Sequence, residues 1–154
     1  MTDEAPWYDT IPIPALLRHA RNTYGIAMRE ALDAAGYDDI PGNGLYVIGG
    51  LARGAGDIPL GQLVKELRVS KQSAGQLVDT LVMRGYLERT MDPDDRRKLT
   101  VTLTERGREA AAVQTSAREK IDAALLAGVG EKGIEVTRRV LAALIGLGRE
   151  AEEH

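Results

Sequence analysis

The feature that most constrains the fold is a change in the spacing of apolar residues near the middle of the chain. Within residues 60–67 and again within 70–84, apolar side chains recur three or four positions apart, which places them on one face of a helix. Over Leu99–Leu103, apolar and polar residues alternate instead, as they do in a half-buried strand. Two short helices followed by a pair of strands predict a helix-turn-helix with a β-hairpin, or wing, directly after it.

Local signals in the same region predict where these elements begin and end. Ser70 is a good N-cap for the second helix, and Gly85 stands where the chain would leave that helix in a left-handed conformation. Residues 86–90 are expected to form the first strand of the hairpin, and the acidic run Asp92–Asp95 its turn. Thr104 is then placed to cap a further helix.

The rest of the chain is expected to be helical. Helical spacing predicts a helix from about residue 14 to 35, a short one over 45–53, and two more after Thr104, separated by a break at Gly128–Gly130. The small central core offers too little surface to bury the apolar faces of these helices. We therefore expect the first and last helices to pack against a second copy in a two-fold homodimer, with a helical bundle within one chain as the alternative.

These elements together predict a mainly α fold with a small β-wing, a winged helix-turn-helix flanked by N- and C-terminal dimerisation helices. The length of 154 residues suits a single domain. Within it we expect N-terminal helices over 12–56, the winged core over 57–104 and C-terminal helices over 105–150.

The distribution of charge is more informative than its sum. The chain carries a net charge of −3, which gives no general indication of a nucleic-acid partner. Residues 58–103, however, hold eight basic and six acidic side chains, so that a modestly basic middle lies between acidic flanks. A solvated surface of mixed charge is the alternative interpretation of the same pattern.

Composition excludes several classes of function. The absence of Cys excludes disulfides, thiolate catalysis and thiol-based redox sensing, and the two His leave little for a metal site. The sequence contains no nucleophile–base pair and no phosphate-binding loop, so we expect no enzymatic activity, cofactor or metal. It also has no apolar run of membrane-spanning length, and its acidic start lacks the features of a secretory signal, so a cytoplasmic location is expected.

Residues Leu60–Gly107 resemble the winged helix-turn-helix core of MarR-type transcriptional regulators. The most specific part is the wing, with Gly85–Arg89, then Asp92–Arg97, then Leu103-Thr104 and Gly107 at the family's spacing. The resemblance implies a homodimeric repressor that binds a pseudo-palindromic operator in double-stranded DNA. Each subunit would place one recognition helix in the major groove.

In this sequence the resemblance assigns the recognition helix to Ser70–Arg84. Its apolar stripe would face the core, which leaves outward, as candidates for DNA contact, Lys71, Gln72, Ser73, Gly75 and Gln76. Glutamine can pair bidentately with adenine, and a helix N-terminus favours phosphate, although ordinary surface polarity would also explain both glutamines. Many relatives carry Thr or Ser at the position of Gly75 and Arg near that of Gln76, so the sequence preference of the family does not carry over.

The wing supplies a second group of candidates: Arg96, Arg97 and Lys98. The family pattern implies that one wing arginine enters the minor groove, with Arg97 the first choice and Arg96 the second. Asp95 is expected to hold the wing through an ion pair, because a carboxylate would repel phosphates. Further candidates for phosphate contacts are Lys65, Arg68 and Arg89.

Relatives in this family often sense small anionic aromatic ligands in a cleft between the dimer helices and the DNA-binding lobe. The candidates to line such a cleft here are Trp7, His19, Tyr24 and Tyr46, with packing or surface roles as the alternative. A different function also remains open, that of a winged-helix module that binds protein or serves assembly without reading DNA. Salt-dependent DNA binding that weakens in Arg97→Ala would separate the two.

Overall fold

The computed structural model describes residues 3–95 and 97–153. The chain divides into two compact units, residues 1–117 and residues 118–154. The first unit contains the short 3-10 helix η1 (Trp7–Thr10), three strands and every helix up to the first part of α5 (Glu105–Glu153). In the described part of the chain, none of the helices has an apolar stretch long enough to cross a bilayer.

The first two α-helices are α1 (Ile13–Ala34) and α2 (Gly44–Arg53), joined by a loop that an arginine holds in place. Arg29 of α1 donates hydrogen bonds to three successive carbonyl oxygens of that loop, those of Ile40 (2.6 Å), Pro41 (3.3 Å) and Gly42 (3.2 Å). Backbone carbonyls of a loop need such partners when no helix or strand supplies them. The loop is thereby fixed to α1 on one side and leads directly into the buried helix α2.

The helix-turn-helix consists of α3 (Leu60–Leu67) and α4 (Lys71–Met83), as the sequence predicts. Between them Arg68 adopts a left-handed conformation with φ of 52°, which turns the chain sharply after α3. Ser70 caps α4 as expected, because its Oγ accepts a hydrogen bond of 3.1 Å from the backbone N–H of Ser73. The apolar stripe of α4 is directed into the core.

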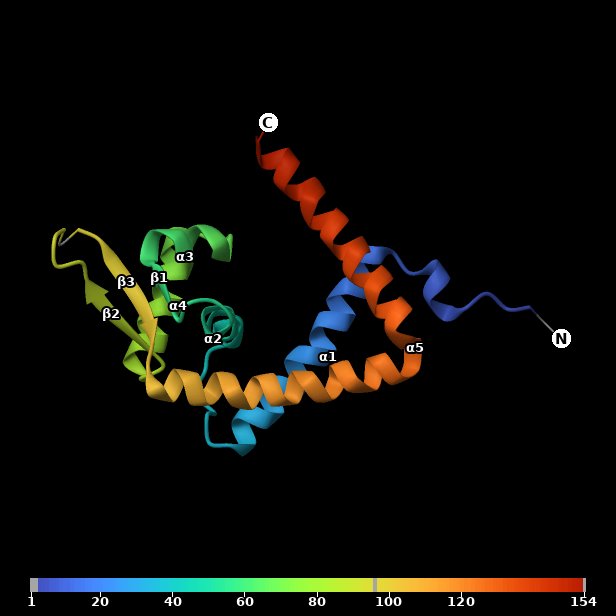
Figure 1. Cartoon of the computed structure of the whole chain (residues 1–154), viewed down its shortest axis with the longest axis horizontal. Coiled ribbons are helices and arrows are strands. Elements are labelled where there is room, and N and C mark those ends of the chain that lie inside the picture. Colours follow the sequence, from blue (N-terminus) through green and yellow to red (C-terminus); the bar gives the residue numbers. More distant parts are fainter. Residues whose placement is uncertain (1–2, 96, 154) are drawn as a thin grey trace. The chain divides into compact units, whose positions relative to one another are not determined.

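The sheet has three antiparallel strands in the order β1–β3–β2, namely β1 (Asp57–Pro59), β3 (Leu99–Leu103) and β2 (Leu87–Met91). Strands β2 and β3 form the predicted wing, and Figure 1 shows them extending away from the start of α5. The sequence did not predict strand β1, which lies between the helices expected over 45–53 and 60–67. Three residues are too few to show an alternating pattern, and β1 exists because Ile58 pairs with Val101 in β3.

The junction between the wing and α5 explains the spacing of glycine and threonine in this region. Gly85 leaves α4 with φ of +85°, and Thr104 donates a hydrogen bond of 2.5 Å to its carbonyl oxygen. The Oγ1 of Thr104 also accepts from the N–H of Gly107 at 3.0 Å, so it caps α5. A Cβ at Gly107 would collide with the carbonyl oxygen of Tyr86, so only glycine fits there.

One apolar core holds the first unit together. Its largest fully buried side chains come from α1, α2, α4, the strands and the turn after α4, and are Leu32, Ile48, Val78, Leu81, Tyr86, Leu87 and Val101. The first part of α5 packs on this core through Ala110 and Ala111. Buried Gln114 of α5 donates a hydrogen bond of 2.7 Å to the carbonyl oxygen of Leu45, which joins α5 to α2.

The second unit consists of the later part of α5. Its backbone leaves helical geometry at Gly130 (φ 78°, ψ 169°), which confirms the break predicted at Gly128–Gly130. Within this unit Arg118 donates a hydrogen bond of 2.9 Å to Asp122, one turn further on. Several large apolar side chains of this unit are exposed, among them Leu144, Ile145 and Leu147.

Candidate nucleic-acid interface

The N-terminal half of α4 presents polar and cationic side chains to solvent. Four of the five residues predicted to contact DNA are exposed there, namely Lys71, Gln72, Ser73 and Gln76. The opposite face of the helix is fixed by Ala74, Val78 and Leu81, all with no exposed surface. A rigid helix thus displays amide and ammonium groups that can reach base edges and phosphates.

Gly75, the fifth of these residues, is half-buried on the same half of α4. Apart from its two neighbours and the backbone of its own helix, no described residue has a heavy atom within 4 Å of the position that a Cβ would occupy. Its φ is not positive, so neither backbone conformation nor packing in the free chain requires glycine here. Glycine in a helix costs about 1 kcal/mol relative to alanine, and nothing in the free chain offsets this cost.

The turn of the wing is organised by its aspartates. Asp92 accepts a hydrogen bond of 2.9 Å from the N–H of Asp94, in the manner of an Asx-turn. Asp95 accepts from both the backbone N–H (3.0 Å) and the Nε (3.4 Å) of Arg97, so the ion pair expected of Asp95 is present. The Arg97 side chain is nevertheless 93% exposed, and an exposed pair of this kind restrains it only weakly.

The remaining cationic candidates differ in their surroundings. Lys65, Arg68 and Lys98 are exposed, whereas Arg96 lies outside the described residues. Arg89 of β2 forms an ion pair with Asp79 of α4, which the sequence did not indicate because the partners are ten residues apart on different elements. The pair connects the wing to the recognition helix. In the free chain Arg89 therefore already binds a carboxylate, in addition to the phosphate contact predicted for it.

A polar cluster at the base of the wing was also not predicted. The buried hydroxyl of Tyr86 donates to Oδ1 of Asp39, and Arg106 donates to the same Oδ1 (3.3 Å) and to the Tyr86 oxygen (3.0 Å). Arg84 adds a hydrogen bond to the backbone carbonyl of Asp39. The cluster therefore joins three segments: the loop before α2, the turn after α4 and the first turn of α5.

The pKa values of these groups reflect their mutual contacts. Burial, together with the hydrogen bond to Asp39, raises the pKa of Tyr86 to about 12. The hydrogen bond from Tyr86, followed by the charge of Arg106, lowers the pKa of Asp39 below its ordinary value of 3.8. Asp39 is therefore ionised and Tyr86 protonated at neutral pH, which is the combination that the hydrogen bonds need.

A cavity of about 980 Å³ lies within the first unit, between α1, the loop before α2, α2 itself, β1, α3 and α4. Of the four residues proposed to line an effector cleft, Tyr46 lines this cavity, whereas Trp7, His19 and Tyr24 are not among its lining residues. Arg21 lies over the ring of Tyr46, 4.1 Å from its centroid. Further charged lining residues, which the sequence did not single out, are Arg53, Asp57 and Glu66.

Comparison with known families gives one match. Residues 38–98, which contain α2, α3, α4, β2 and the turn of the wing, match the model of the MarR family. No curated protein sequence matches the chain significantly.

Solved structures resemble the whole fold. The chain superimposes on Streptococcus pneumoniae FabT in complex with DNA with a TM-score of 0.76 at 23% identity, covering 90% of this chain and 96% of that one. For a mutant MarR from E. coli complexed with operator DNA the TM-score is 0.68 at 20% identity, with 92% and 99% covered. A probable transcriptional regulator from Pseudomonas aeruginosa gives 0.63 at 26% identity, with 87% and 97% covered. The predicted mainly helical fold with a small β-wing is thereby confirmed, as a winged helix-turn-helix.

Proposed function

Because residues 38–98 match the MarR-family model and the chain has the fold of MarR regulators, we propose that it is a transcriptional regulator that binds double-stranded DNA. The observation that carries the proposal is the exposed N-terminal half of α4, which displays Lys71, Gln72 and Gln76 beside a wing with exposed Arg97. Two solved structures of the same fold are described as complexes with DNA.

In this proposal α4 enters the major groove and the wing lies along the adjacent minor groove. Gln72 and Gln76 read base edges, because a carboxamide can donate to and accept from adenine at once. Arg97 enters the minor groove, where a narrow groove concentrates negative potential. Phosphate contacts come from the flanking cations Lys65, Arg68, Arg89 and Lys98, and each adds about one unit to the salt dependence of binding.

The regulator acts as a homodimer on an operator with two half-sites. Apolar side chains remain exposed on both units of one chain, including Ile13 and Ile26 of α1 and Leu144, Ile145 and Leu147 of α5. Exposed apolar surface of this extent indicates an interface, and a second copy offers the same helices in return. The first helix and residues 105–150 would then form the dimer interface, as the sequence predicts.

A small effector regulates DNA binding from the cavity of the first unit. Arg21 and Arg53 supply positive charge to a lining that also holds Asp57 and Glu66, and Tyr46 supplies an aromatic wall. These groups suit an aromatic ligand whose anionic group pairs with the arginines. Ser73 and Leu77 of α4 also line the cavity, so a bound ligand would touch the recognition helix itself. Ligand and DNA would then be coupled through α4, and repression would be relieved on binding.

Selection of duplexes from a random-sequence pool tests the proposal. We expect the protein to enrich a pseudo-palindromic site, and Arg97→Ala to weaken binding to every duplex by a similar factor. The matched control Arg97→Lys keeps the charge but loses the planar fork, so its loss should be smaller. Enrichment of nothing by a folded protein, together with no salt-dependent binding, would favour the alternative of a protein-interaction or assembly module.

A further inference from the structure

The polar cluster of Asp39, Tyr86 and Arg106 is more completely bonded than a surface ion pair. One carboxylate oxygen of Asp39 accepts from both Tyr86 and Arg106, and the guanidinium of Arg106 lies 4.6 Å from the ring centroid of Tyr86. The ring centroid of Tyr37 is 5.4 Å from the same guanidinium, and the rings of Tyr37 and Tyr86 are 6.3 Å apart. The Nε of Arg106 is buried and without a hydrogen-bond partner among the described residues. The side chains of Arg106 and Asp39 are 42% and 39% exposed, so water also reaches this pair. What distinguishes the cluster is that one carboxylate oxygen joins three separate segments of the chain.

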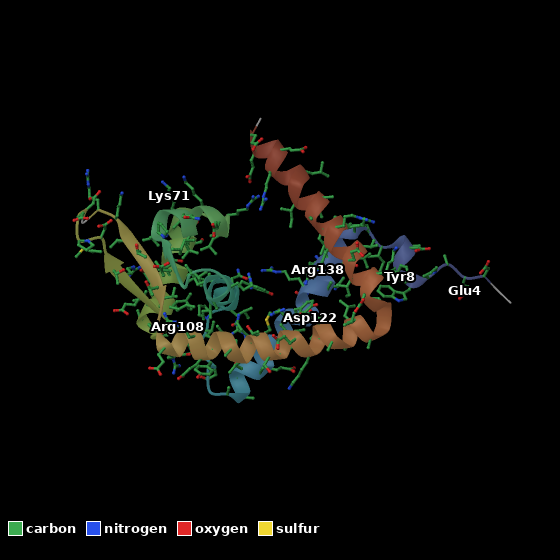
Figure 2. All side chains as sticks on the ribbon, viewed as in Figure 1. Glu4, Tyr8, Lys71, Arg108, Asp122 and Arg138 are labelled. Carbon is green, nitrogen blue, oxygen red and sulfur yellow. The ribbon has the colours of Figure 1, made fainter. Side chains whose placement is uncertain are left out.

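The place of the cluster in the fold separates it from the proposed DNA contacts. Tyr86 follows the C-terminal end of α4, whereas Gln72 and Gln76, which are proposed to contact base edges, lie in the N-terminal half of the same helix. A helix of 13 residues is about 20 Å long, so the two ends cannot meet the same base pairs. Figure 2 shows Lys71, at the start of α4, on the opposite side of the winged core from Arg108, which stands two residues after Arg106.

We propose that Asp39, Tyr86 and Arg106 are positioning residues for DNA binding, which hold the C-terminal end of α4 against the first turn of α5 without touching DNA. The inference rests on the proposed function. Tyr86 is fixed to the end of α4 by the hydrogen bond from its N–H to the carbonyl oxygen of Leu81 (2.9 Å). Arg106 belongs to the helix that carries the proposed dimer contacts. The cluster thus sets the direction in which each protomer presents its recognition helix.

Such a role has a specific consequence for a dimer. Two recognition helices must enter successive major grooves about one helical turn, or 34–36 Å, apart. A looser joint between α4 and α5 leaves each helix able to read its own half-site but lowers the fraction of dimers with the correct spacing. The loss of affinity then appears on duplexes with two half-sites and not on duplexes with one.

The test compares Tyr86→Phe with the matched control Tyr37→Phe. Both remove one hydroxyl and keep a ring against Arg106, but the Tyr37 hydroxyl bonds Glu109 (2.9 Å) and not Asp39. The probe is the two-half-site duplex that the parent selects from a random pool, beside the same duplex with one half-site scrambled. Asp39→Asn serves as a second variant, and circular dichroism with urea unfolding establishes that each variant is folded at the assay temperature.

For Tyr86→Phe and Asp39→Asn we expect about a tenfold loss of affinity for the two-half-site duplex, which is typical of removing a hydrogen bond to a charged group. We expect less than about a twofold change on the single half-site, and an unchanged salt slope because no phosphate contact is removed. Tyr37→Phe should match the parent throughout.

Three outcomes would overturn the inference. The folded variants could bind both duplexes as tightly as the parent, they could lose affinity equally on both duplexes, or Tyr37→Phe could lose as much affinity as Tyr86→Phe. Failure of the parent itself to bind would instead refute the proposed function.

Discussion

The two ends of α4 differ in how their polar groups are used. At the N-terminal end, Lys71, Gln72 and Gln76 are exposed to solvent. At the C-terminal end, Arg84 and Tyr86 bond to Asp39, and the chain there is tied to α5. The comparison indicates a division of labour within one short helix, because exposed groups are available to a ligand whereas bonded groups fix geometry.

The largest expected effect is a loss of stability from a buried residue near the C-terminal end of α4. Leu81→Ala removes a side chain with no exposed surface, and we expect the free energy of unfolding to fall by about 2–5 kcal/mol. Met83→Ala, two residues later on a side chain that is 83% exposed, should change it by less than about 0.5 kcal/mol. Urea unfolding measures both variants. Similar losses in the two would mean that the core does not lie where the structure places it.

A smaller effect, on binding alone, is expected from the wing. Arg97→Ala should weaken binding to all duplexes by about 1–2 kcal/mol per protomer and lower the salt slope by about one unit for each phosphate that the arginine no longer neutralises. The unfolding free energy should stay within about 0.5 kcal/mol of the parent value, since this side chain is exposed. Fluorescence anisotropy over a salt series gives the affinity and the salt slope. Parent-like affinity of a folded Arg97→Ala protein for every duplex would contradict minor-groove contact by Arg97.

Gly75→Ala should move stability and binding in opposite directions. Alanine in a helix is favoured over glycine by about 0.5–1 kcal/mol, and the position has room for a Cβ, so thermal stability should rise. Binding should weaken, because the methyl group stands on the half of α4 proposed to approach DNA. Gly61→Ala in α3, which also has no described atom within 4 Å of the new Cβ, is the control and should leave operator preference unchanged. A Gly75→Ala protein with parent-like affinity would remove this residue from the interface.

The smallest expected effect is a pH dependence from Asp39. The pKa of Asp39 is lowered in the folded chain, so its contribution to stability is complete above the ordinary value of 3.8 and is lost as the pH falls through the lower, folded pKa. The difference in unfolding free energy between the parent and Asp39→Asn should therefore shrink as the pH is lowered from about 5 to 2. A constant difference over this range would mean that Asp39 is not ionised within the cluster.

Features that depend on neighbours in sequence were predictable. The cap at Ser70, the left-handed exit at Gly85 and the alternation in β3 each need only a few adjacent residues. The break in α5 was predictable for the same reason, because three residues at Gly128–Gly130 carry the signal.

Features that depend on distant partners were not predictable. Strand β1 exists through its pairing with β3, and the contact between Asp79 and Arg89 joins a helix to a strand. The Asp39–Arg106 ion pair spans 67 positions. Taken alone, each charged residue looks like an ordinary surface charge, and the three residues of β1 look like part of a loop. Only folding brings the partners together. The cavity shows the same limitation, since its lining residues Arg21 and Arg53 come from different helices and the sequence singled out neither of them.

The most direct test of the account is the stoichiometry and salt dependence of binding to the selected two-half-site duplex. Sedimentation and anisotropy should give two protomers per duplex, with the logarithm of the association constant falling linearly as the logarithm of salt concentration rises. A protein that stays monomeric and binds no duplex even in dilute buffer would contradict the claim that paired recognition helices and wings form a DNA-binding surface.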